Sequence, residues 1–250
     1  MTASPIGVLR GYRLVCRWQL IQLKEVLPFI VFAQLVFATG GAIGLGFLIP
    51  HIDPQAASYL ASGSFLLSLL LVGIVIVPSA ATEARTLGTL DYMWSLPVPR
   101  LTYLIADLTI WFVAVLPGLV VSLVVTSLRF NFDLRISPML VPAVAMALLT
   151  AAAVGYAIAL HSTSNQVTNL FSNLALVLVF LFSPLNFPAE RLPEWLQSIH
   201  AVLPIAPMAD LMRGSLIAGT HPRTAHDFLV LALWCTVGVV ATLRMVAKRK

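Results

Sequence analysis

The chain has 250 residues, of which 59% are hydrophobic and only 10% are charged, with a formal net charge of +5. Ordinary soluble domains carry about 25% charged residues. The composition therefore excludes a soluble globular fold and indicates an integral membrane protein. The excess of basic residues is read as a membrane-topology signal, not as a nucleic-acid-binding surface.

Residues 1–25 precede the first long apolar run and have a basic helical face. At 100° per residue, four basic side chains project within about 60° of one another: Arg10, Arg13, Arg17 and Lys24. The other side is mainly apolar, although Gln19 and Gln22 also fall there. The pattern predicts a cytoplasmic amphipathic helix in the membrane interface. It fits a simple surface anchor, and it equally fits an anchor that also docks a cytoplasmic partner.

Runs without Asp, Glu, Lys or Arg predict the membrane spans: 26–50, 54–82, 108–128, 136–189 and 228–243. A span needs about 20 residues, so the fourth run holds two spans, separated by the polar stretch 161–169. The last run is short and extends if Arg244 and Lys248 snorkel. We therefore predict an all-α membrane protein with six spans, near 27–49, 59–81, 103–127, 138–160, 170–187 and 226–246.

The basic residues also predict the orientation. With six spans both termini share a side, and that side holds ten of the fifteen Lys and Arg residues. The positive-inside rule places both termini and the segment 83–100 in the cytoplasm. Twelve arginines against three lysines hint at a bacterial source. The expected location is thus the bacterial plasma (inner) membrane.

The polar segment 83–100 lies between the second and third spans. Leu87, Leu90 and Trp94 recur at helical spacing and predict a short amphipathic helix. Gly88 would permit a close backbone approach, and two prolines, Pro97 and Pro99, would end the helix. A solvated loop is the alternative, but it explains the apolar residues less well. Glu83 would sit where the second span leaves the membrane, a position at which a carboxylate needs a partner or water.

The succession Glu83, Gly88-Thr89-Leu90-Asp91 and Leu96-Pro97-Val98-Pro99-Arg100 resembles the hallmark of ABC-2 type permeases. The resemblance covers essentially the whole chain, with residues 26–250 as one transmembrane domain. It implies that this segment couples the permease to a separate P-loop ATPase subunit. The coupling residues would be Glu83, Arg85, Gly88, Thr89, Leu90, Asp91, Pro97 and Arg100. Met93-Trp94 departs from the family's more usual pair of leucines.

A second segment supports this resemblance. The succession Phe187-Pro188, Leu192-Pro193-Glu194-Trp195-Leu196 and Arg213-Gly214 is similar to the outer region of ABC-2 permeases. It implies short outer helices over 188–214, between spans five and six, and an outer gate. The gate residues would be Pro188, Trp195, Pro204 and Arg213. Independently, Leu192, Leu196, Ile199 and Leu203 form an apolar stripe at helical spacing. A passive outer cap is the alternative.

Several function classes find little support in the sequence. The chain has no phosphate-binding loop motif, so it is not expected to be an enzyme by itself. It is not expected to bind a cofactor either, because ATP and Mg would belong to the partner. It shows no Cys/His cluster with metal-ligand spacing. The interiors of the spans are expected to lack ionisable residues, which counts against a proton- or sodium-coupled carrier.

The expected function is the membrane subunit of an ABC exporter. It would move hydrophobic or amphipathic drug- or lipid-like compounds, as in antibiotic efflux. Export of a lipid-linked glycan, an ATP-independent secondary carrier and a membrane scaffold are the alternatives. One coupling segment per chain predicts a dimer with a second copy or a homologous permease. Gly, Ser and Ala in the first, second and fourth spans would permit close helix contacts.

Overall fold

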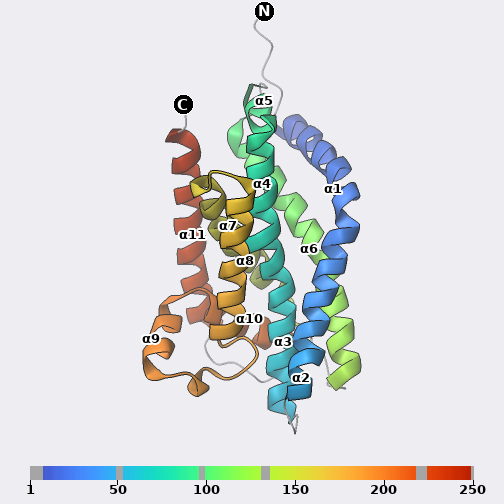
Figure 1. The fold of residues 1–250 in the computed structure, drawn as a ribbon, viewed down its shortest axis with the longest axis vertical. Coiled ribbons are helices and arrows are strands. Elements are labelled where there is room, and N and C mark those ends of the chain that lie inside the picture. The colour runs from blue at the N-terminus through green and yellow to red at the C-terminus, as the bar shows by residue number, and fades with distance from the viewer. Residues whose placement is uncertain (1–7, 49–52, 96–98, 131–135, 218–223, 249–250) are drawn as a thin grey trace, which may run out of the picture.

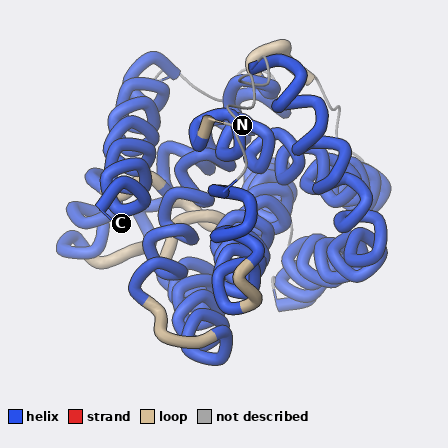
Figure 2. The backbone as a smooth tube through the Cα atoms, turned by 90° about the horizontal axis from the view of Figure 1, so that it is seen from above, coloured by secondary structure: helices blue, strands red, loops and turns tan. Residues whose placement is uncertain are grey.

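A computed structural model describes residues 8–48, 53–95, 99–130, 136–217 and 224–248. Within these ranges the chain is an elongated bundle of helices, and the described residues form no strand (Figures 1 and 2). Helix α1 begins, and α11 ends, at the end of the bundle where α5 lies, whereas α9 lies at the opposite end (Figure 1). We refer to these as the α5 end and the α9 end.

The helices follow one another with short connections. Their bounds are α1 Val8–Thr39, η1 Gly40–Gly44, α2 Leu45–Leu48, α3 Pro54–Leu70, η2 Leu71–Ile76, α4 Val77–Thr86, α5 Thr89–Ser95, α6 Arg100–Phe130, α7 Leu140–His161, α8 Asn165–Phe182, η3 Ala189–Arg191, α9 Glu194–Val202, α10 Ile205–Leu216 and α11 Thr224–Lys248.

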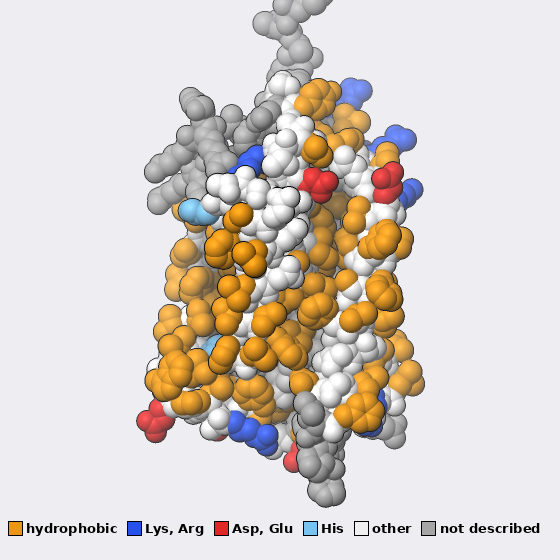
Figure 3. All heavy atoms as spheres, in the orientation of Figure 1, with side chains coloured by type: hydrophobic (Ala, Val, Ile, Leu, Met, Phe, Trp, Pro, Cys, Tyr) orange, Lys and Arg blue, Asp and Glu red, His pale blue; other side chains and the backbone are white. Residues whose placement is uncertain are grey.

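The surface of the bundle agrees with a membrane protein. Hydrophobic side chains cover the middle of the visible face, and charged side chains gather toward its two ends (Figure 3). Five helical stretches are long and apolar enough to cross a membrane, and they involve α1, the α3–α4 rod, α6, α7 and α8. The chain is thus an all-α integral membrane protein. The sixth span stays a prediction, because the apolar part of α11 is shorter, Ala225–Ala241.

The second span forms the centre of the bundle. Helix α3, the π-helical turns of η2 and helix α4 follow without a break, and every residue from 60 to 74 is buried. Two of its buried serines bond within the helix: Ser62 donates to the carbonyl of Ser58 at 2.8 Å and Ser68 to that of Ser64 at 3.1 Å. Helices α1, α6, α7 and α10 pack around this rod.

Small residues let α7 approach this central rod closely. Gly73 lies against Ala151, and Gly155 lies against the carbonyl of Gly73 and the ring of Pro78, so a Cβ atom at either glycine would collide. Close approach of backbones is how membrane helices associate without a hydrophobic driving force between them. These glycines of the second and fourth spans therefore allow close packing within one chain, and they do not support a contact between two chains.

The amphipathic leader and the first span form one helix. Helix α1 runs from Val8 to Thr39 without ending near residue 25, and Pro28 lies inside it. A proline removes one backbone hydrogen bond, which a membrane helix tolerates. One face of α1 is buried, at Val15, Leu23 and Ile30, and the helix packs along α6. The predicted basic face is exposed: Arg10, Arg13, Arg17 and Lys24.

Candidate functional site

The predicted coupling segment forms a helix–turn–helix at the α5 end. Helix α4 ends at Thr86, and α5 covers Thr89–Ser95. Gly88 has a φ of +71° in the turn between them. This left-handed conformation strains any residue with a Cβ, which explains the glycine. A Cβ at Gly88 would meet open space within this chain, so the expected close backbone approach there stays a prediction.

Several side chains of this segment are exposed on the surface of the chain. Glu83 is exposed in the last turn of α4, and Leu87 and Tyr92 are exposed by 72% and 65%. Leu87 lies in the turn before α5, so the predicted Leu87–Leu90–Trp94 stripe does not run along one helix. Thr89 is half-buried, and Met93 is buried within the chain. Pro97 lies outside the described residues, as do the side chains of Leu90, Asp91, Trp94 and Arg100.

Arg85 turns back toward the bundle and holds the end of α7. Its Nη1 donates to the carbonyl of Ala159 at 3.1 Å, and its Nη2 donates to the carbonyl of Ser162 at 2.6 Å. The last carbonyls of a helix have no partner within the helix and carry its negative end. A guanidinium placed there satisfies two of them and interacts favourably with the helix dipole.

Two further contacts tie α4 to the start of α8. The hydroxyls of Thr82 and Thr168 lie 2.9 Å apart and share a buried hydrogen bond. Ser79 reaches the side-chain oxygen of Asn169 at 2.5 Å. Together with Arg85, these bonds fasten the base of the coupling segment to the turn between α7 and α8. The polar stretch 161–169 therefore not only separates two spans but also holds this base.

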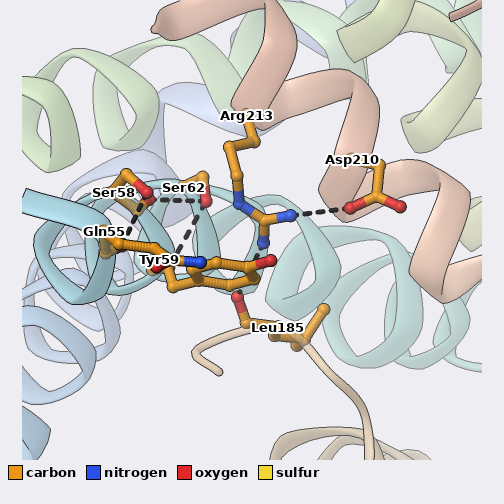
Figure 4. Close-up of polar contacts among 7 residues, drawn as sticks. All are labelled: Gln55, Ser58, Tyr59, Ser62, Leu185, Asp210 and Arg213. Carbon is orange, nitrogen blue, oxygen red and sulfur yellow. Dashed lines mark hydrogen bonds and ion pairs between the residues drawn. The ribbon is translucent and has the colours of Figure 1, made fainter. Parts of the chain in front are cut away.

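A second arginine is enclosed at the α9 end (Figure 4). Arg213 of α10 is 3% exposed and forms an ion pair with Asp210, with Nη1 at 2.6 Å from Oδ1. Its Nη2 donates to the carbonyl of Leu185 at 3.3 Å, and its guanidinium carbon lies 3.7 Å from the ring centroid of Tyr59. Burial lowers the pKa of Arg213 from its ordinary value, and the charge of Asp210 opposes this shift. Arg213 thus links α10, α3 and the segment after α8.

Helix α9 has an exposed apolar face. Trp195, Ile199 and Val202 are exposed by 65%, 47% and 67%. They follow one another at helical spacing, whereas Leu196 is half-buried. The predicted stripe Leu192–Leu196–Ile199–Leu203 is therefore wrong as a single face. The exposed apolar face of α9 is instead the row that begins at Trp195.

The other side of α9 is fastened to the bundle. His200 is buried, and its Nε2 lies 3.0 Å from the carbonyl of Phe182, to which it donates. Burial lowers the pKa of His200, and the Phe182 carbonyl opposes this shift. The indole nitrogen of Trp234 donates to the carbonyl of Val202 at 2.8 Å. Of the predicted gate prolines, Pro204 is buried and Pro188 is half-buried.

A polar cluster inside the membrane domain was missed by the sequence analysis. Asp107 of α6 accepts hydrogen bonds from Nε2 of Gln19 on α1, at 2.9 Å, and from the hydroxyl of Tyr156 on α7. Nearby, the hydroxyl of Tyr12 donates to Thr109 at 3.1 Å. The expectation that the spans hold no ionisable residue is therefore wrong. Charge-free runs do not reveal Asp107, because the run 108–128 begins directly after this residue.

One signal in the sequence pointed to this cluster. Gln19 interrupts the apolar side of the amphipathic leader, and it is this side chain that pairs with Asp107. A polar residue on the packing face of a membrane helix needs a polar partner, because hydrocarbon offers none.

Comparison with known families supports the family resemblance that the two segments described above carry. The model of the ABC-2 type transporter family matches residues 11–217. The chain belongs to the ABC-2 type transporter family. It is thus a transport permease, the membrane part of an ABC transporter. The match runs from α1 through α10 and includes both the coupling segment and the α9 end. A comparison with curated protein sequences found no match.

Proposed function

We propose that this ABC-2 permease is the membrane subunit of an ATP-driven exporter. It works with a separate P-loop ATPase subunit and moves hydrophobic or amphipathic compounds, drug-like or lipid-like, out across the bacterial plasma membrane. The α5 end faces the cytoplasm, as the distribution of basic residues favours. On this proposal, the exposed surface of Glu83, Leu87 and Tyr92 receives the ATPase.

The observation that carries the proposal is the position of Arg85. It lies two residues after Glu83 on the docking surface, yet its guanidinium binds the carbonyls of Ala159 and Ser162 in the α7–α8 turn. A movement of the docked ATPase would displace α4 and, through Arg85, the end of α7, while the Thr82–Thr168 hydrogen bond passes the movement to α8. The permease thereby has a direct polar link from the docking surface to two of its spans.

The proposed complex contains two permease chains. ATPase subunits of this kind act as a pair, and one coupling segment per chain then requires a second copy or a homologous permease on a twofold axis. Cross-linking in membranes should trap permease dimers. A strictly monomeric permease in an active complex would contradict this part of the proposal.

The test is to coexpress the permease with a candidate P-loop subunit, purify the complex by an affinity tag and reconstitute it. In the Arg85→Gln variant we expect normal assembly but at least a roughly tenfold loss of transport. A hydrogen bond to a charged group contributes about 1.5–3 kcal/mol, and 1.4 kcal/mol corresponds to about tenfold.

Thr86→Ala is the matched control, because Thr86 is the next residue and its hydroxyl bonds back to the carbonyl of Glu83 at 3.0 Å. It should transport like the unmodified protein. Unchanged transport and ATPase rates in Arg85→Gln would remove the coupling link. Failure of any P-loop subunit to copurify would contradict the partner.

A further inference from the structure

The Asp107 cluster joins three helices at the α5 end of the membrane domain. Asp107 on α6 receives one hydrogen bond from Gln19 on α1 and one from Tyr156 on α7. Both donors are neutral. In the described part of the chain, no Lys or Arg side chain forms an ion pair with Asp107. The basic residues of the α1 leader are all exposed: Arg10, Arg13, Arg17 and Lys24.

A carboxylate inside a span is costly unless something compensates its charge. Hydrogen bonds from an amide and a phenol orient the group but do not neutralise it. Acidic residues in membrane spans generally pair with another charge or mark the path of a ligand. Asp107 thus has two oriented neutral donors and, among the described residues, no ion pair with a Lys or Arg side chain.

Three aromatic residues lie next to this carboxylate in the fold or along α6. Tyr156 bonds to it directly, and Tyr103 and Trp111 lie one helical turn before and after Asp107 on α6. The faces of aromatic rings attract cations, Trp most strongly, and the attraction increases when water is excluded. A carboxylate with several rings is the combination that recognises an organic ammonium group.

The cluster can be reached, and its depth suits an amphipathic molecule. Tyr103, Asp107 and Trp111 are half-buried, not sealed. Asp107 lies five residues beyond Thr102, where the apolar stretch of α6 begins, which is about 8 Å along the helix. An amphipathic cation in a leaflet holds its charge near the headgroups and its apolar part among the acyl chains. Its charge would therefore lie close to the level of Asp107.

We infer that the Asp107 cluster is a recognition site for amphipathic organic cations that enter from the inner leaflet. This inference rests on the proposed function and names its substrate class. Asp107 provides the counter-charge, while Tyr103, Trp111 and Tyr156 contact the apolar or aromatic part of the cation. Gln19 and the Tyr156 hydroxyl hold the carboxylate in place before the ligand arrives.

Two lipophilic ions of nearly the same shape and opposite charge test this directly. The purified full-length permease, in phosphatidylcholine nanodiscs without an ATPase, is titrated with tetraphenylphosphonium and with tetraphenylborate. We expect saturable binding of the cation, at least about tenfold tighter than that of the anion. Asp107→Asn should lose this preference, and Asp107→Glu should restore most of it.

Glu25→Gln is the matched control, because it removes an exposed carboxylate from α1, the helix that also carries Gln19. It should bind the phosphonium like the unmodified protein. Equal binding of both ions by the unmodified permease would overturn the inference without any variant. So would an Asp107→Asn protein that melts normally and binds the cation unchanged.

The inference and the proposed function can fail separately. Cation binding is measured without the ATPase, so a coupling surface that proves wrong does not affect it. If Asp107→Asn does not fold, Trp111→Leu replaces it and should weaken phosphonium binding several-fold while tetraphenylborate binding stays the same. Equal loss for both ions in this variant would also overturn the inference.

Discussion

The two ends of the bundle both place an arginine near the end of a helix, but they use it differently. At the α9 end, Arg213 is enclosed by Asp210, the ring of Tyr59 and the carbonyl of Leu185. At the α5 end, Arg85 is half-buried and reaches across to the α7–α8 turn. The first arrangement joins elements that must stay together. The second links an exposed surface to the end of α7.

The surroundings of the two arginines strengthen this contrast. At the α9 end, His200 and Trp234 bond to backbone carbonyls of neighbouring segments. At the α5 end, Glu83 and the apolar side chains of Leu87 and Tyr92 are exposed. Substitutions at the α9 end should therefore reduce stability, and substitutions at the α5 end should reduce coupling while stability is kept.

The largest expected effect is on the stability of Arg213→Ala. Removing one partner of a buried ion pair costs about 3–5 kcal/mol, and we expect the lower part of this range because the Asp210 side chain is 38% exposed. Thermal unfolding of the purified permease measures the loss. Arg191→Ala, which removes an exposed arginine at the same end, should change stability by less than about 0.5 kcal/mol. Similar stabilities of the two variants would show that the enclosure of Arg213 is unimportant.

The next effect is on coupling in Glu83→Ala, alone and combined with Asp91→Ala. If these carboxylates contact the ATPase, each charged contact contributes about 1.5–3 kcal/mol, so transport and stimulated ATPase activity should fall tenfold or more. Expression, membrane insertion and the melting temperature should stay near those of the unmodified protein. Normal efflux by the double variant would remove the α5 end as the docking surface.

A smaller effect is expected for Trp195→Ala. Its side chain is largely exposed, and tryptophan anchors segments at membrane interfaces. We expect a few-fold loss of transport, about 1 kcal/mol, in a complex that assembles normally. Assembly, ATPase rate and efflux should be measured on the same preparation. Wild-type efflux would favour a passive cap, whereas loss of assembly would show that Trp195 stabilises the fold.

The smallest effect is a pH dependence caused by His200. Burial lowers the pKa of His200 in the folded protein, whereas in the unfolded chain it stays near 6.5. The unfolded state therefore binds the proton more readily, and stability should fall as the pH drops below about 6.5. His200→Gln keeps a donor for the Phe182 carbonyl but does not titrate. The melting temperature of this variant should lose this part of its pH dependence, and an unchanged profile would contradict the assignment.

Local sequence patterns were enough to predict the membrane class, the helical fold and the short helix between the second and third spans. These patterns are continuous apolar runs, the glycine of the turn and the prolines after α5. Each of them determines the structure of only a few neighbouring residues. For that reason α4 and α5 separate at Gly88, and α6 begins after Pro99. The family followed from the same local motifs and is confirmed by the match over residues 11–217.

What the sequence by itself determined is therefore which segments enter the membrane and where the polar connections lie, because hydrophobicity and turn chemistry are properties of neighbouring residues. Tertiary structure decided the partners of individual side chains. Arg85 and Ser162 are 77 residues apart, and Gln19 and Asp107 are 88 apart. Which polar groups meet depends on helix rotation and crossing, and these are set by packing such as Gly73 against Ala151. For this reason Asp107, which lies just outside a charge-free run in the sequence, is held by α1 and α7 inside the membrane domain.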